Sequence, residues 1–396
     1  MKNLSTLIGG RTVGVVGVGQ WGQRLVNTLQ PHTPHPVLQS DPPRAEEERE
    51  FPHIPLSDLT RQSDIIFLST DLTAIPNILQ EIRTQLRAHQ VIIDIASSKR
   101  AFLPTLREID ASERAIVGSI HPMTRADIPS LRGQNGIVCT VSERSQEAEE
   151  IGEALFKDQE MIVHRMRLEE HDRMMDQLQG KPHFFQVAAC ASMARSLEKG
   201  TMAGLEKIGS PNFQLFAMSV GRGALLDPDL QADIITSMAS SPEGRSDLEQ
   251  IIRMQRTILD LALHDAALQG TDRFQRERQL PAFIKHMRET LDPTGTWREH
   301  MRKQTDTIIV RLANIKKRCM RLTAKKDTPG MLKLVCEILE RHGIDLNAID
   351  SMPTKDFPKG IAFELGHKDG ASIDIHQLEQ DLDAIDVILQ KEEPNQ

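Results

Sequence analysis

The sequence predicts an α/β chain in three parts, and three observations support this prediction. An apolar strand near the N-terminus leads directly into closely spaced glycines, a pattern with which many doubly wound sheets begin. Short apolar runs then alternate with helical patterns over residues 1–165, as in a parallel, doubly wound sheet. Long helical patterns fill residues 166–318, and short strands return in residues 319–396. We therefore expect three domains with these boundaries.

The first predicted strand, Val13–Val16, runs into the motif Gly17-x-Gly19-x-x-Gly22. In Rossmann-type domains the first glycine permits a tight turn and the second lets a pyrophosphate approach the backbone. The third lets the following helix pack against the strand. The helix that begins near Gln20 would direct its free N–H groups at the phosphates. A glycine-rich turn without a ligand is the alternative, but the flanking strand and helix favour a dinucleotide.

An acidic residue, Asp41, follows the second predicted strand, Val37–Gln39. At about this position an acid accepts hydrogen bonds from the adenosine ribose hydroxyls in NAD enzymes. Ser40 and Arg44 lie nearby and leave NADP open as the alternative to NAD. The predicted cofactor-binding residues are Gly17, Gly19, Gln20, Trp21, Gly22 and Asp41.

Five further strands are predicted in the first part of the chain, with amphipathic helices between them. The strands are Ile65–Ser69, Val91–Ile95, Ala115–Ile120, Gly136–Val141 and Met161–His164, and the helices include Ile75–Leu86 and Ala148–Phe156. Ligands of such sheets bind at the carboxyl ends of the strands. Residues that directly follow strands are therefore the first candidates for a functional site.

Two strand ends carry groups suited to proton chemistry. Ser97 follows the strand Val91–Ile95 and lies near the expected position of the nicotinamide, although it could instead only cap the next helix. His121 follows the strand Ala115–Ile120, and its imidazole can accept a proton from a substrate hydroxyl during hydride loss. A packed structural histidine is the alternative. We predict both residues as catalytic.

The second part is predicted to be entirely helical, with a charged run that breaks at Pro281 and at residues 292–295. Its predicted helical segments are Leu168–Lys199, Asn212–Gly221, Pro228–Ala239, Ser246–Gln269 and Arg273–Arg311. Arg222 lies among apolar residues, where a cation is costly unless it binds an anion or forms an internal salt bridge. His171 and Asp172 open the first helix, and we interpret them as supporting structure.

The third part begins near Cys319 and alternates strands with two helices. Its predicted elements are the strand Met320–Ala324, the helix Met331–Arg341, the strands Ala348–Met352 and Ile361–Leu365, the helix Ile375–Leu382 and the strand Ala384–Leu389. This βαββαβ order is the ferredoxin-like arrangement.

Composition limits the partners of the protein. The net charge of −8, without a long basic run, argues against nucleic acid or an anionic membrane. The chain has no signal peptide and no apolar stretch long enough to span a bilayer, so we expect a soluble, cytoplasmic protein. The four cysteines show no metal or redox spacing, so we expect buried thiols and no metal site. They are Cys139, Cys190, Cys319 and Cys336.

Over nearly its whole length the chain resembles the prephenate dehydrogenase (TyrA) family. The resemblance rests on Gly17-x-Gly19-x-x-Gly22, Asp94-Ile95-Ala96-Ser97-Ser98-Lys99, His121-Pro122-Met123, Glu170-His171-Asp172, His183-Phe184 and Gly221-Arg222. It implies oxidative decarboxylation of prephenate to 4-hydroxyphenylpyruvate, with NAD or NADP, in tyrosine biosynthesis. It also implies that His121 deprotonates the ring hydroxyl, that Ser97 orients this hydroxyl, and that Arg222 binds a substrate carboxylate. The helical block would be a dimerisation domain, so we expect a homodimer.

Two positions depart from the family pattern. Thr124-Arg125 follow Met123, where relatives usually have a small residue or phenylalanine and then glycine. Gln214 stands where relatives can carry a second arginine. Arg125 could take over a carboxylate contact, and we count Arg125 and Gln214 with the substrate-binding residues.

The departures leave several alternatives open. The substrate could be arogenate or another amino-substituted prephenate, and the chain could also be an inactive, amino-acid-sensing relative. Another β-hydroxyacid or imino-acid dehydrogenase is a further alternative, against which His121 argues.

The C-terminal part resembles an ACT domain, the module by which amino-acid enzymes sense their products. The resemblance rests on Asp327-x-Pro329-Gly330-x-Leu332 and Asp350-Ser351-Met352-Pro353. It implies that an aromatic amino acid binds where two modules pair, with Gly330, Asn347 and Ser351 as effector-binding residues. Met352 stands where that family usually has arginine, so the identity of the effector stays open. An ACT fold used only for dimer contact is the alternative.

Overall fold

The computed structural model describes residues 3–41, 53–196, 205, 209–315, 320–344, 346–354, 357, 359–367 and 374–390. Two compact units divide the chain, Met1–Ile252 and Arg253–Gln396. Arg44, Lys199 and Cys319, which the sequence predictions include, lie outside the described residues.

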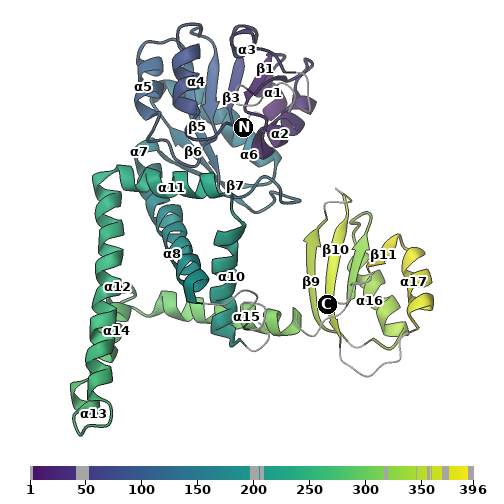
Figure 1. Cartoon of the computed structure of the whole chain (residues 1–396). Coiled ribbons are helices and arrows are strands. Elements are labelled where there is room, and N and C mark those ends of the chain that lie inside the picture. The colour runs from purple at the N-terminus through teal and green to yellow at the C-terminus, as the bar shows by residue number, and fades with distance from the viewer. Residues whose placement is uncertain are drawn as a thin grey trace. The chain divides into compact units, whose positions relative to one another are not determined.

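The first unit contains a seven-stranded sheet with the order β2-β1-β3-β4-β5-β6-β7 (Figure 1). Its strands are β1 (Val13–Val16), β2 (Leu38–Ser40), β3 (Ile65–Leu68), β4 (Val91–Asp94), β5 (Ile116–Pro122), β6 (Asn135–Thr140) and β7 (Ile162–Arg167). Strand order reverses at β1, which pairs with β2 on one side and β3 on the other. The glycine motif therefore follows the strand at which doubly wound sheets form a ligand crevice.

The predicted Rossmann-like α/β sheet is confirmed, and strands β1 to β5 pair in parallel. The next strand departs from this pattern, because β6 runs antiparallel to β5 and β7 then runs parallel to β6. The link between β5 and β6, residues 123–134, contains no helix. A parallel partner for β5 would usually need a helical crossover, so the chain turns back instead.

Helices cover both faces of this sheet. One face packs against α1 (Leu4–Ile8), α2 (Gln20–Leu29) and α6 (Gln146–Asp158), and the other against α3 (Leu56–Gln62), α4 (Ile75–Ile82) and α5 (Leu103–Ala111). Successive strand residues point to opposite faces, so Ile92 lies in one apolar cluster and Ile93 in the other. Each such buried aliphatic side chain contributes about 1.5–3 kcal/mol, which makes the sheet a firm support for its strand ends.

A helical part follows β7 in the first unit. It consists of α7 (Leu168–Met175), α8 (Lys181–Ser196), α10 (Pro211–Leu225), α11 (Pro228–Ser240) and the start of α12 (Pro242–Leu268). The predicted single helix from Leu168 is interrupted by a π-helical turn, Asp176–Gly180, that separates α7 from α8. Here the backbone packs closely against α11, because a Cβ on Gly180 would lie 2.6 Å from the sulfur of Met238. Single π-helical turns often mark functional sites.

The second unit begins within α12 and continues with α13 (Phe274–Glu277), α14 (Leu280–Leu291) and α15 (Thr296–Ile315). The predicted break at residues 292–295 is confirmed. The other break lies before α14 rather than at Pro281, which occupies the first turn of that helix. Proline fits there because the first N–H groups of a helix have no intrahelical acceptor. No helix among the described residues of either unit is long and apolar enough to cross a membrane.

A four-stranded antiparallel sheet ends the second unit, with the order β11-β8-β10-β9 (Figure 1). The strands are β8 (Met320–Ala324), β9 (Leu346–Pro353), β10 (Ile361–His367) and β11 (Val387–Gln390), and the helices are α16 (Met331–Arg341) and α17 (Ile375–Asp383). Apolar side chains of both helices and of the sheet share one core, among them Val335, Leu378 and Phe363. The two helices therefore pack on the sheet, and β9 and β11 are its edge strands.

Candidate functional site

The three glycines after β1 have the geometry that a dinucleotide needs. Gly17 has φ +85°, which favours glycine, and its N–H donates to the Ser40 carbonyl at 2.7 Å. A Cβ on Gly22 would lie 1.9 Å from the Gly17 carbonyl oxygen, so α2 packs too closely for any side chain there. A Cβ on Gly19 would meet no heavy atom within 4 Å, which leaves open space over the start of α2. This arrangement fits a pyrophosphate at the helix N-terminus.

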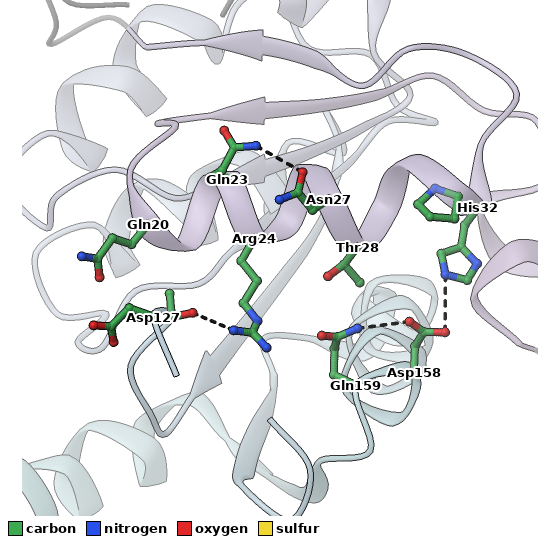
Figure 2. A pocket seen from close by; sticks show the side chains of 11 residues that line it. Gln20, Gln23, Arg24, Asn27, Thr28, His32, Asp127, Asp158 and Gln159 are labelled. Atoms are coloured by element: carbon green, nitrogen blue, oxygen red, sulfur yellow. Dashed lines mark hydrogen bonds and ion pairs between the residues drawn. The ribbon is translucent and has the colours of Figure 1, made fainter. Parts of the chain in front are cut away.

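The other predicted cofactor residues lie around this turn. Asp41 is buried directly after β2, at 6% exposure. Trp21 is half-buried and packs against the apolar cluster beneath α2. Gln20, the exposed first residue of α2, lies at one end of an open polar groove along that helix, and His32 lies at the other end (Figure 2).

Arg24 connects the cofactor helix with the loop that follows β5. Its Nη1 donates to the carbonyl oxygens of Ala126, at 2.7 Å, and Ile128, at 2.8 Å. Arg125, a predicted substrate-binding residue, lies in the same loop and forms a two-bond ion pair with Asp127. This hydrogen-bonded pair raises the pKa of Arg125 and partly neutralises the charge that the sequence assigned to a substrate.

His121 lies near the end of β5 and begins a buried chain of hydrogen bonds. Its Nδ1 lies 3.0 Å from Nε2 of His171, and Nδ1 of His171 lies 2.9 Å from Oδ1 of Asp172. All three side chains are almost completely buried, with exposures of 4%, 0% and 6%. Our interpretation of His171 and Asp172 as supporting structure therefore missed their contact with the predicted base.

Desolvation determines the charge state of these histidines. Burial lowers the pKa of His121 well below its usual value, and the charges of His171 and Lys99 add to this shift. Burial also lowers the pKa of His171, although the hydrogen bond to Asp172 opposes that change. Both imidazoles are therefore neutral near pH 7, and His121 is available as a proton acceptor.

Lys99 is completely buried and joins three elements of the site. Its Nζ donates to Oδ1 of Asp94 at 2.5 Å and to the Ile120 carbonyl at 2.8 Å. Its backbone N–H donates to Oδ1 of Asp172 at 3.2 Å. The end of β4, the end of β5 and the start of α7 are thus held together beside His121.

Ser97 precedes Lys99 in the same loop and has a buried Oγ without a hydrogen-bond partner in the described part of the chain. It does not cap the next helix, because Phe102 is the N-cap residue of α5. A buried, unpaired hydroxyl is unfavourable unless a ligand satisfies it. Ser97 thus offers a donor and an acceptor at the carboxyl edge of the sheet.

Two polar residues of the helical part, to which the sequence analysis gave no role, have features of a functional site. Nε2 of Gln179, in the π-helical turn, lies 3.4 Å from Nε2 of His121. His183, on α8, has a buried Nδ1 with no partner among the described residues. Burial and the nearby charge of Arg222 lower the pKa of His183. Helical periodicity could not identify Gln179, because the π-helical turn shifts the helix face.

Arg222 and Gln214 both lie on α10, which packs against α8. The Arg222 side chain is exposed, whereas Nε2 of Gln214 donates to the Gly209 carbonyl at 3.2 Å. Within the described ranges, no hydrogen bond or ion pair joins Arg222, Gln214 or Arg125 to His121. The structure thus gathers the proton-transfer groups but does not connect the three substrate-binding candidates to them.

The predicted effector residues lie on two elements of the C-terminal sheet unit. Gly330 is the N-cap residue of α16 with φ +91°, and open space surrounds its Cβ position. Ser351 is exposed on the edge strand β9. The backbone of Asn347 lies in β9 where the pairing with β10 shifts register, and its side chain lies outside the described residues.

The described cysteines are free thiols, but only Cys139 is fully buried, whereas Cys190 and Cys336 are half-buried. Burial raises the pKa of Cys139 to about 12, so this thiol is unreactive. The described residues contain no group of three or more His, Cys, Asp or Glu side chains that could hold a metal ion.

The fold and the glycine turn define a Rossmann-type nucleotide-binding protein. In agreement, the family profile "NADP oxidoreductase coenzyme F420-dependent" matches residues 12–98. Solved structures of similar fold include prephenate dehydrogenase from A. aeolicus in complex with hydroxyphenyl propionate and NAD+. It has a TM-score of 0.50 and 16% identity, over 71% of this chain and 96% of that one. A putative prephenate dehydrogenase from Corynebacterium glutamicum also gives a TM-score of 0.50 and 16% identity, over 76% and 90% of the two chains.

Two curated relatives match part of the chain. The chain is 26% identical over 181 residues to a probable arogenate/prephenate dehydrogenase of Methanocaldococcus jannaschii. The aligned region covers 45% of this chain and 39% of the relative. It is 23% identical over 254 residues to the T-protein of Haemophilus influenzae, over 64% of this chain and 61% of the relative. The chain thus spans less than two thirds of the length of these relatives. The chain is thus similar over part of its length to a probable arogenate/prephenate dehydrogenase, and its fold is similar to that of solved prephenate dehydrogenases.

Proposed function

We propose that the protein is an NAD(P)-dependent dehydrogenase that decarboxylates prephenate to 4-hydroxyphenylpyruvate in tyrosine biosynthesis. The observation that carries this proposal is a neutral, buried His121 at the carboxyl end of β5. It lies in a sheet whose first strand ends in a dinucleotide-type glycine turn. The similarity to a probable arogenate/prephenate dehydrogenase supports the same activity class.

The glycine turn and Asp41 would hold the cofactor. Gly17 and Gly22 bring α2 close to the turn, and the open space at Gly19 accepts the pyrophosphate. The buried carboxylate of Asp41 suits two ribose hydroxyls better than a 2′-phosphate, so NAD is favoured over NADP. The nicotinamide ring, when bound, supplies the acceptor for a hydride.

His121 would accept the proton of the ring hydroxyl while a hydride leaves the carbon that bears this hydroxyl. The alcohol is thereby converted into a carbonyl. The bond to the ring carboxylate then breaks, carbon dioxide leaves, and its electron pair makes the ring aromatic. The phenolate regains the proton from His121, so the base ends in its starting state. Ser97, with its unpaired buried hydroxyl, would orient the substrate oxygen.

The two carboxylates of the substrate would need cationic side chains as partners, and His121 is already assigned to the ring hydroxyl. Arg222 on α10 is exposed and unpaired among the described residues, and it lies close enough to His183 to influence its titration. Arg222 would therefore bind a carboxylate, with His183 beside it. Arg125 and Gln214 would complete this end of the site. Arogenate is the alternative substrate, in which an amine replaces the side-chain ketone of prephenate and both carboxylates remain.

Regulation and assembly are part of the same proposal. We propose a dinucleotide domain at 1–165, a helical dimerisation domain at 166–318 and an ACT domain at 319–396 that binds an aromatic amino acid through Gly330, Asn347 and Ser351. A homodimer would cover large apolar side chains that are exposed on α10, α12 and α14 in the single chain. They include Phe216, Met218, Ile258, Leu259, Leu263 and Leu291.

The test is the formation of reduced cofactor when the full chain meets prephenate or arogenate with NAD or NADP. We expect rapid reduction with prephenate and NAD, and inhibition by tyrosine or phenylalanine. Reduction with arogenate alone would correct the substrate. No reduction with any of the four pairs, in protein that binds the cofactor, would overturn the proposed activity.

A further inference from the structure

We propose that His171 and Asp172 are positioning residues that fix the tautomer of His121, so that its Nε2 is the unprotonated nitrogen that faces the substrate. This inference rests on the proposed function and deepens it. Neither residue would touch the substrate, because both are buried behind His121.

The proton positions follow from the chemistry of the three groups. An ionised carboxylate only accepts hydrogen bonds, so Asp172 requires a hydrogen on Nδ1 of His171. A neutral His171 then has an unprotonated Nε2, which can only accept. His121 must therefore carry its hydrogen on Nδ1, since two lone pairs would otherwise face each other over 3.0 Å. Its Nε2 is left without a proton.

Asp172 cannot easily turn away from this chain. The same oxygen that accepts from His171 also accepts the backbone N–H of Lys99 at 3.2 Å. The Lys99 ammonium is in turn held by Asp94 and the Ile120 carbonyl. The arrangement of Asp172 is thus fixed by β4, β5 and α7 together, and burial keeps water from offering other partners.

One negative charge near His121 can stabilise its protonated form during the reaction. The ionisable groups near it are His171 and Asp172 on α7, Lys99 after β4, Asp94 on β4 and Cys139 on β6. Lys99 and Asp94 form a pair, and the Cys139 thiol stays neutral, so Asp172 is the remaining negative charge. When His121 becomes a cation during the reaction, Asp172 stabilises it through His171.

We call the hydrogen-bonded chain from Asp172 through His171 to His121 the relay, and Asp172→Asn tests it. The amide of asparagine can donate to Nδ1 of His171, which would place the hydrogen of His171 on its Nε2 and that of His121 on its Nε2. We expect kcat to fall by about 10²-fold or more, as for other bases in the wrong tautomer, with little change in KM. Asp176→Asn is the matched control. It removes a buried carboxylate one turn further along the chain, whose partner is Arg100 rather than a histidine. A loss of kcat in Asp172→Asn no larger than in Asp176→Asn would overturn the proposal.

A second measurement does not depend on turnover or on the folding of a variant. In wild-type protein labelled with ¹⁵N-histidine, NMR should find the hydrogen of His121 on Nδ1 and Nε2 unprotonated. A hydrogen on Nε2 in the wild type would overturn the relay even if the enzyme is active. Conversely, this proton pattern in a protein that reduces no cofactor would support the relay and reject the proposed substrate.

Discussion

The two ends of the candidate site differ in how their polar side chains are satisfied. Around His121, buried groups bond to one another in a chain that reaches Asp172, and Lys99 holds its supports in place. Around Arg222, by contrast, the cation is exposed and the buried Nδ1 of His183 lacks a partner among the described residues. The difference indicates that folding alone fixes the hydrogen-bonded chain behind His121, whereas Ser97, Arg222 and His183 keep polar groups open for a ligand. We call the region around His121 the proton-transfer end and the region around Arg222 the proposed anion-binding end.

The largest effect is expected from the proton-transfer end. His121→Asn should lower kcat by about 10²- to 10⁴-fold, the usual contribution of a positioned general base. Cofactor affinity should change little, because His121 lies on β5 and the glycine turn follows β1. Steady-state kinetics and calorimetric titration of the cofactor measure the two quantities. Unchanged turnover would remove His121 from the mechanism. The two ends of the site would then differ only in how their side chains pack.

Lys99→Met tests whether the same end is held by its buried ion pair. Removing one partner leaves Asp94 charged and unpaired at 0% exposure, which typically costs about 3–5 kcal/mol of unfolding free energy. Denaturant unfolding measures this loss. As the control, Arg132→Met breaks an ion pair with Glu160 on the surface and should cost at most about 1 kcal/mol. Equal effects of the two substitutions would contradict a structural role for the buried pair.

The sequence predicted the cofactor side of the site better than the network behind His121. The glycine turn and the strand ends are local patterns, and β1 and Ser97 lie where those patterns predict, whereas β5 extends to Pro122 and includes His121. The relay joins residues that are 50 positions apart, and periodicity cannot show that His171 faces His121. The π-helical turn that carries Gln179 was likewise hidden, because the apolar spacing favours one continuous helix.

At the anion-binding end, Arg222→Ala should mainly raise KM for the substrate. A charged hydrogen bond contributes about 1.5–3 kcal/mol, which corresponds to roughly a 10- to 100-fold change in KM with kcat nearly constant. Arg173→Ala removes an exposed arginine from α7 and serves as the control, with KM unchanged. If Arg222→Ala leaves KM unaltered, the arginine has a structural role and the two ends of the site differ less than we infer.

The smallest effect is a pH dependence of stability that arises from three histidines. The pKa values of His121, His171 and His183 are all lowered in the folded protein, mainly by burial. As pH falls below the unfolded value of about 6.5, the unfolded chain binds protons that the folded chain does not, so stability decreases.

Each histidine can contribute at most about 1.4 kcal/mol per pH unit between its unfolded and folded pKa. Denaturant unfolding at pH 7.5 and at pH 5.5 measures the slope, and the decrease should be smaller in His121→Asn. His183→Asn should reduce the slope less than His121→Asn does, because His121 is buried and its pKa lies well below the usual value, whereas His183 is only half-buried. Equal reductions would mean that the anion-binding end excludes water as completely as the proton-transfer end.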